Sequence, residues 1–165
     1  MAEYLIPKMK IEINNRQKNC HPNITNIKKL VCKLMYKAIA LAPELQWSEI
    51  SIVLVNDEQI RDCKAQLFDI HEITDVISLR YDPIPGERNL YSGEIFANVQ
   101  RAITHSARTR HGWTASKELS LYLAHGCDHL MNSSDYDRKG YLRMRRRELQ
   151  WLKARDIAKL STNLL

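Results

Sequence analysis

Apolar residues recur along the chain with two different periods, and these periods predict its secondary structure. Between residues 24 and 41 they recur every three or four positions, which indicates an amphipathic helix that ends before Pro43. A second helix is expected to begin at Asn56 or Asp57, both favourable N-cap residues, and to run to about Phe68. Alternating or β-branched apolar runs predict four strands, at residues 9–14, 49–55, 74–79 and 93–99.

The remainder of the chain is expected to be helical. A long helical stretch over residues 99–131, with a possible break near Gly112, precedes a final helix over residues 137–160. The predicted order is strand, helix, strand, helix, two strands and two helices. This order predicts a single domain over residues 1–165 of the α/β (α+β) class, in which about four to five helices pack on one mixed four-stranded sheet.

Composition and charge narrow the range of partners. A hydrophobic content of 44% and a charged content of 27% exclude a disordered or collagen-like chain. Residues 1–100 hold 12 Lys and Arg against 13 Asp and Glu, whereas residues 101–165 hold 13 against 6. This basic C-terminal part favours a polyanion such as a nucleic acid as the partner, with a solvated helix face as the alternative.

The sequence also bears on the compartment. No run of eighteen apolar residues is present, and the first residues do not form a secretory signal, so we expect a cytoplasmic protein without a membrane partner. The cysteines have no Cys-x-x-Cys spacing, which argues against a zinc ribbon and against a disulfide framework. Four free thiols are therefore expected, at Cys20, Cys32, Cys63 and Cys127.

Two histidines at helical spacing carry the clearest chemical signal. His125 and His129 lie four residues apart in an apolar helical segment, so both rings project from one face, one turn apart. Such a pair suits zinc or a similar cation. Alone it is not decisive, because histidines at this spacing also occur in cores and on surfaces.

A third ligand is expected where the chain turns back after this helix. Asp135 stands ten positions after His125, and Asn132 stands between them, a residue type that tolerates left-handed backbone conformation. We prefer Asp135 over Asp137 as the third ligand because its offset fits such a turn. Asp128 is expected to point away from the pair and to form an ion pair or support a ligand.

Three protein ligands leave a coordination position open for water, which is typical of a catalytic site rather than a structural one. Gly126 occupies the position that a glutamate base has in the His-Glu-x-x-His proteases, so peptide hydrolysis by that mechanism is not expected. Such a site must rely on metal-bound hydroxide, on another residue or on the substrate phosphate, so the sequence identifies no catalytic base.

The segment from His125 to His129, with its third ligand ten positions on, resembles the YbeY family of bacterial metal-dependent endoribonucleases. Other segments match in the family's order. They are Thr74-Asp-Val-Ile-Ser78, Gly93-Glu-Ile95, the pair Glu118-Leu119, and Met144 with Glu148. The resemblance covers about residues 50–155.

This resemblance implies a single-strand-specific, metal-dependent endoribonuclease with one zinc ion per chain and no nucleotide cofactor. It implies action on small-subunit (16S-type) rRNA at the 3′ end, ribosome quality control, and the small ribosomal subunit as partner. Two departures stand out. The family's third histidine is Asp135 here, which makes another divalent ion such as manganese an alternative. The family's arginine falls at Phe68, so a cation for phosphate is missing there.

Several residues are candidates for contact with substrate. Arg108, Arg110 and Ser78 are the first choice, and an arginine cluster at positions 143 and 145–147 is a further candidate for phosphate contact. The competing hypothesis is a ribosome-associated RNA- or protein-binding module with a structural metal and little catalysis. Phe68 and Gly126, where the arginine and the carboxylate are missing, favour it. Hydrolysis of a peptide or small ester is a third, weaker hypothesis.

Overall fold

The computed structural model describes residues 8–108 and 111–165, which form four strands and six helices. The strands are β1 (Lys10–Asn15), β2 (Trp47–Val55), β3 (Val76–Tyr81) and β4 (Tyr91–Asn98). The helices are α1 (Ile24–Ile39), α2 (Asp57–Phe68), α3 (Val99–Ser106), α4 (Ala115–Leu130), α5 (Arg138–Lys153) and α6 (Arg155–Leu160). The α+β class and the order of elements up to β4 are confirmed, and six helices are described where about four to five were expected.

The four strands form one mixed sheet in the order β1-β2-β4-β3. β1, β2 and β4 are parallel, and β3 joins the edge of β4 antiparallel, with Ser78 opposite Ile95. The hairpin between β3 and β4 is therefore the direct connection, whereas the parallel strands are joined through helices. The single mixed sheet that the sequence predicts is present.

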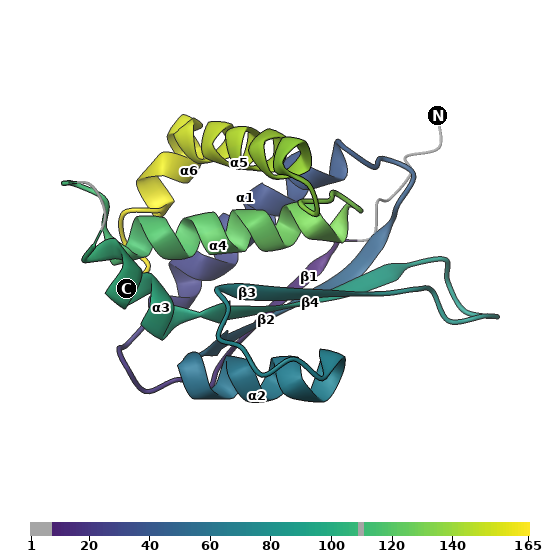
Figure 1. Ribbon diagram of the computed structural model, residues 1–165. Coiled ribbons are helices and arrows are strands. Elements are labelled where there is room, and N and C mark those ends of the chain that lie inside the picture. Colours follow the sequence, from purple (N-terminus) through teal and green to yellow (C-terminus); the bar gives the residue numbers. More distant parts are fainter. Residues whose placement is uncertain (1–7, 109–110) are drawn as a thin grey trace.

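Helices cover the two faces of this sheet unequally (Figure 1). α1 and α4 lie on one face, with α5 and α6 stacked outside them, and α2 lies alone on the other face. The main core forms between the sheet and α1 and α4, and includes Leu34, Ile52, Ile95 and Leu123, all fully buried. A smaller cluster of Val53, Val55, Ile60 and Ile77 lies under α2.

α4 is the central helix of the thicker layer. Twelve of its sixteen residues are buried, because the sheet lies on one side of it and α5 on the other. A helix enclosed in this way is apolar around most of its circumference. Small residues let it approach the sheet. A Cβ atom at Gly93 would lie 2.9 Å from Leu130, and one at Gly126 would lie 2.7 Å from Ile95.

The helical C-terminal part is interrupted at two places. The expected break near Gly112 is present, since α3 ends at Ser106 and α4 starts at Ala115, and Gly112 has a φ of +87°. The prediction of one helix over residues 137–160 was wrong, because Ala154 has an extended backbone (ψ 130°) that separates α5 from α6. This bend lets the fully buried Ile157 reach the main core beside α1.

Two expectations drawn from composition can be compared with the fold. All four cysteines are free thiols, as predicted, and Cys127 is buried. In the described part of the chain, no helix combines the length and the apolar character that a membrane crossing requires.

Candidate metal centre

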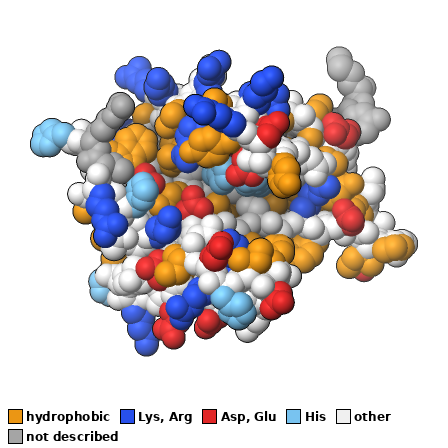
Figure 2. Space-filling model, viewed as in Figure 1, with side chains coloured by type: hydrophobic (Ala, Val, Ile, Leu, Met, Phe, Trp, Pro, Cys, Tyr) orange, Lys and Arg blue, Asp and Glu red, His pale blue; other side chains and the backbone are white. Residues whose placement is uncertain are grey.

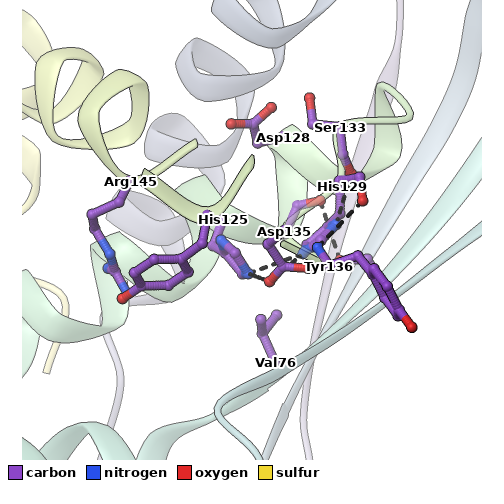
Figure 3. Close-up of polar contacts among 12 residues, drawn as sticks. Val76, His125, Asp128, His129, Ser133, Asp135, Tyr136 and Arg145 are labelled. Carbon is purple, nitrogen blue, oxygen red and sulfur yellow. Dashed lines mark hydrogen bonds and ion pairs between the residues drawn. The ribbon is translucent and has the colours of Figure 1, made fainter. Parts of the chain in front are cut away.

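His125 and His129 lie in the last two turns of α4, and their rings converge on one point (Figure 3). The two Nε2 atoms are 2.9 Å apart, and Asp135 Oδ2 lies 3.4 Å from the first and 3.5 Å from the second. Donor atoms bound about 2.0–2.1 Å from a tetrahedral zinc ion would be roughly 3.3–3.4 Å apart. The three side chains therefore form a group that could hold a metal ion. We call His125, His129 and Asp135 the metal group.

Hydrogen bonds fix which nitrogen of each ring faces this point. His125 Nδ1 lies 2.7 Å from Glu148 Oε1, and His129 Nδ1 lies 3.1 Å from the carbonyl oxygen of Ser133. Both oxygens accept, so each Nδ1 is the nitrogen that donates and each Nε2 faces the point of convergence. Two nitrogens 2.9 Å apart need a proton or a metal ion between them, and Asp135 adds negative charge at the same point.

Asp135 reaches the histidines because the chain reverses directly after α4. Asn132 adopts the left-handed conformation expected of it, with a φ of +62°. Arg147 of α5 then fastens the following loop, donating to Ser133 Oγ at 3.0 Å and to both carboxylate oxygens of Asp128 at 3.0 and 2.7 Å. This arginine thus ties α4, the loop and α5 together beside the metal group.

The two other aspartates near the group have structural roles. Asp137 is the N-cap of α5, and its Oδ1 accepts a hydrogen bond from the amide of Gly140 at 2.6 Å. The geometry therefore favours Asp135 over Asp137 as the third ligand. Asp128 points away from the histidines and is fully buried in its pair with Arg147 (Figure 3), so the expected ion-pair role is confirmed.

The metal group forms one side of a cavity of about 360 Å³ that also reaches β3 and α2. It is lined by Lys64, Phe68, Thr74, Asp75, Val76, Ile77, Ser78, His125, His129 and Asp135. Gly126 contributes no side chain to this space. A glutamate there would collide with Ile95, so the absence of the protease base follows from how closely α4 approaches the sheet.

The electrostatics of His125 reflect its carboxylate neighbours. Burial alone would lower the pKa of this imidazole, but the hydrogen bond and the charge of Glu148 outweigh burial, with further contributions from Asp75 and Asp135. The net effect is a raised pKa. The site is therefore an anionic environment that stabilises positive charge at the ring, whether a proton or a metal ion supplies it.

Comparison with known proteins supports the motif-based resemblance. The family model described as "Endoribonuclease YbeY" matches residues 12–156 of this chain. The chain belongs to the YbeY family. It is 26% identical over 129 residues to the YbeY endoribonuclease of Clostridium botulinum strain Eklund 17B, covering 67% of this chain and 76% of that protein. The match to the protein of the same name from Protochlamydia amoebophila is 26% over 140 residues, covering 85% and 89%.

A structural comparison agrees on the fold. The solution structure of TM1509 from Thermotoga maritima superposes with a TM-score of 0.56 at 16% identity, covering 94% of this chain and 95% of that one. Membership in the YbeY family confirms the assignment of the chain to the nucleases, within the hydrolase class.

The three predicted substrate-contact residues have different positions. Ser78 lines the metal cavity, but its Oγ donates to the carbonyl oxygen of Gly126 at 3.2 Å and so links β3 to α4. Arg108 is an exposed residue just after α3 and is not among the residues that line the cavity. Arg110 lies outside the described residues.

The arginine cluster of α5 is divided in role. Arg147 is committed to Asp128, and Arg145 donates to the Tyr141 hydroxyl at 3.2 Å. Arg143 and Arg146 are exposed. Figure 2 shows Lys and Arg side chains gathered along the edge of the molecule that α5 and α6 form, above the hollow where a histidine side chain is visible.

The sequence did not indicate the roles of three residues at the site. Asp75 adds a second carboxylate to the cavity, and Lys64 adds a cation. Glu148, which the resemblance named without a role, holds His125. A signal for Glu148 was present: it shares one helical face with Met144 and Trp151, and a carboxylate on an apolar face needs a polar partner. No local signal marked Lys64, because its role depends on how α2 packs.

Proposed function

We propose that this chain is a zinc-dependent, single-strand-specific endoribonuclease that acts in small-subunit rRNA 3′-end processing and ribosome quality control, with the small ribosomal subunit as partner. The observation that carries the metal and the catalysis is the convergence of two imidazole nitrogens and one carboxylate in an open cavity. The family and its relatives, named endoribonucleases, support RNA as the substrate.

His125, His129 and Asp135 would hold the ion, and zinc suits two nitrogen donors and one carboxylate. A bound zinc ion supplies Lewis-acid chemistry: it lowers the pKa of water and polarises a phosphoryl oxygen. Glu148 keeps His125 in the tautomer whose Nε2 faces the cavity, and the Ser133 carbonyl does the same for His129. Asp135 remains partly exposed, which leaves the site open to a phosphodiester.

Asp75 is the carboxylate of the cavity that does not belong to the metal group, and we assign it the acceptance of a proton from the attacking water. Its Oδ1 accepts hydrogen bonds from the amide of Val76 at 3.0 Å and from the hydroxyl of Thr74 at 3.1 Å, so the carboxylate is held in place. Its charge acts on His125, which places it within electrostatic reach of the metal group. A positioned carboxylate of this kind suits a general base.

The polyanion would extend from the cavity towards α5. Arg143 and Arg146 of α5 are exposed and can contact phosphates beyond the scissile one. Free thiols fit a reducing compartment, which supports the cytoplasm as the place of action.

The test is to purify the full chain, measure bound metals and compare cleavage of single-stranded and duplex rRNA fragments by wild type and His129→Ala. We expect one equivalent of zinc in the wild type and a loss of at least 100-fold in cleavage by the variant, with the fold checked by circular dichroism. Cleavage that survives removal of the metal would contradict the proposal. RNA binding without cleavage would instead support a binding module with a structural metal.

The third ligand needs its own comparison. We expect Asp135→Ala to reduce zinc content strongly and Asp137→Ala to lower stability with zinc retained, because Asp137 caps α5. An Asp135→Ala protein with normal zinc content would show that the third ligand is wrong.

A further inference from the structure

Two side chains of α2 line the same cavity as the metal group. Lys64 and Phe68 both line the cavity, and their spacing of four residues puts them on the same face of the helix, one turn apart. Among the described residues that line the cavity, Lys64 is the only lysine or arginine. A cation and an aromatic ring thus line one cavity together with His125, His129 and Asp135.

The fold itself does not account for Phe68. Its side chain is 49% exposed, and it belongs to neither of the two hydrophobic clusters formed by the described residues. Leu67 beside it is similarly exposed but does not line the cavity. An exposed ring at the mouth of a polar cavity offers a flat apolar face on which a nucleobase can stack.

Lys64 is also poorly explained as a structural residue. Its side chain is only 20% exposed, and its Nζ lies 3.3 Å from Glu72 Oε2, whose side chain is 72% exposed. An ion pair with so exposed a carboxylate contributes little to stability. The pairing nevertheless holds the ammonium at the cavity, where a phosphate group can take the place of the Glu72 carboxylate.

We infer that Lys64 and Phe68 form a nucleotide clamp, in which a base of single-stranded RNA stacks on Phe68 while its phosphate contacts Lys64. This inference rests on the proposed function and deepens it. A base can reach the Phe68 ring only when it is unstacked, so the clamp favours single strands over duplexes. The metal group acts on the phosphodiester that the clamp holds in the cavity.

Binding and cleavage together test the clamp. The probe is a fluorescein-labelled, single-stranded 2′-O-methyl oligoribonucleotide, which resists cleavage, titrated against the zinc-loaded full chain at several salt concentrations. Phe68→Leu should weaken binding roughly fivefold or more with an unchanged salt dependence, because only stacking is lost. Lys64→Gln should reduce the slope of log K against log salt by about 0.7, as expected for one phosphate contact.

Two matched controls and one rescue sharpen the result. Leu67→Ala and Lys29→Gln change exposed residues outside the cavity and should bind the probe as the wild type does. Phe68→Trp should restore the affinity that Phe68→Leu loses, and its added fluorescence should be quenched by RNA beyond the wild-type change. A merely structural role for Phe68 would produce neither the rescue nor the quenching.

The failure of the clamp can be distinguished from the failure of the proposed function. If Phe68→Leu and Lys64→Gln both bind within twofold of wild type with the same salt slope, the clamp is overturned, even though cleavage still depends on His129. If His129→Ala cleaves RNA normally while the clamp variants lose affinity, the proposed metal chemistry is wrong and the clamp stands as an RNA-binding site.

Discussion

The two walls of the metal cavity differ sharply in how the fold holds them. α4, which carries both histidines, has twelve of sixteen residues buried between the sheet and α5. α2, which carries Lys64 and Phe68, has one buried residue of twelve, Ile60. The metal side therefore cannot shift without disturbing the main core, whereas the α2 side can change its exposed residues at little cost to the fold.

The two sides of the cavity also differ in how closely their residues match the YbeY family pattern. On the α4 side the chain keeps the spacing that resembles the YbeY family, and the loop after it is tied to α5 through Arg147. On the α2 side it departs from the family, with Phe68 where the resemblance places an arginine. The second departure, Asp135 in place of the family's third histidine, lies in the loop after α4 and not in the helix itself. Both departures thus lie outside the buried part of α4, where a change of side chain disturbs the core least.

The largest expected effect on the α4 wall comes from Arg147→Met. Asp128 is fully buried, and this change leaves its charge without the bidentate partner, so the free energy of unfolding should fall by about 3–5 kcal/mol. Urea unfolding followed by circular dichroism measures it. Arg146→Met, an exposed change one residue earlier, should stay within about 0.5 kcal/mol of wild type. A loss below about 1 kcal/mol for Arg147→Met would show that Asp128 does not depend on this pair.

The next largest effect is expected on zinc affinity, from a change at Glu148, the buried carboxylate that accepts a hydrogen bond from His125. Glu148→Gln keeps the side-chain volume but removes the negative charge that orients His125, so zinc affinity should fall about 10- to 100-fold. Competition with a fluorescent chelator measures this affinity. Glu87→Gln, in the exposed hairpin loop, is the control and should bind zinc like the wild type. Equal affinity in both variants would remove Glu148 from the metal centre.

The fold was largely predictable because its periodic elements are long and its breaks are marked. Asn56 caps α2 and shares a reciprocal capping box with Gln59, which agrees with the expected start of that helix. The division of α5 from α6 was missed because Ala154 is an ordinary helix former. Only the need to bury Ile157 beside α1 bends the chain there, and that need lies in the tertiary structure.

The site was predictable only where it is local in sequence. His125, His129, Asn132 and Asp135 follow helix and turn geometry, so a spacing argument brings them together. Lys64 and Asp75 could not be found in this way. They reach the cavity beside the metal group only because β3 pairs with β4 and α2 packs on the sheet.

A smaller effect tests how closely α4 must approach the sheet. In Gly126→Ala the added Cβ would lie 2.7 Å from Ile95 Cγ2, a branched core atom with little room to move, so stability should fall by about 1–3 kcal/mol. Gln66→Ala on the exposed face of α2 is the matched change and should stay within about 0.5 kcal/mol. Thermal and urea unfolding compare the two. A Gly126→Ala protein as stable as wild type would show that the α4 wall tolerates displacement.

The smallest expected effect is that of removing the N-cap of α2, and it tests most directly whether α2 and the metal group are independent. Asn56→Ala removes the side-chain cap and half of the capping box of α2, so the free energy of unfolding should fall by about 1 kcal/mol. Zinc affinity should remain within twofold of wild type, because no residue of the metal group or its supports lies on α2. Chelator competition and urea unfolding on the same preparation measure both quantities. A tenfold loss of zinc affinity would show that α2 and the metal group behave as one unit, and that α2 does more than present a surface to the substrate.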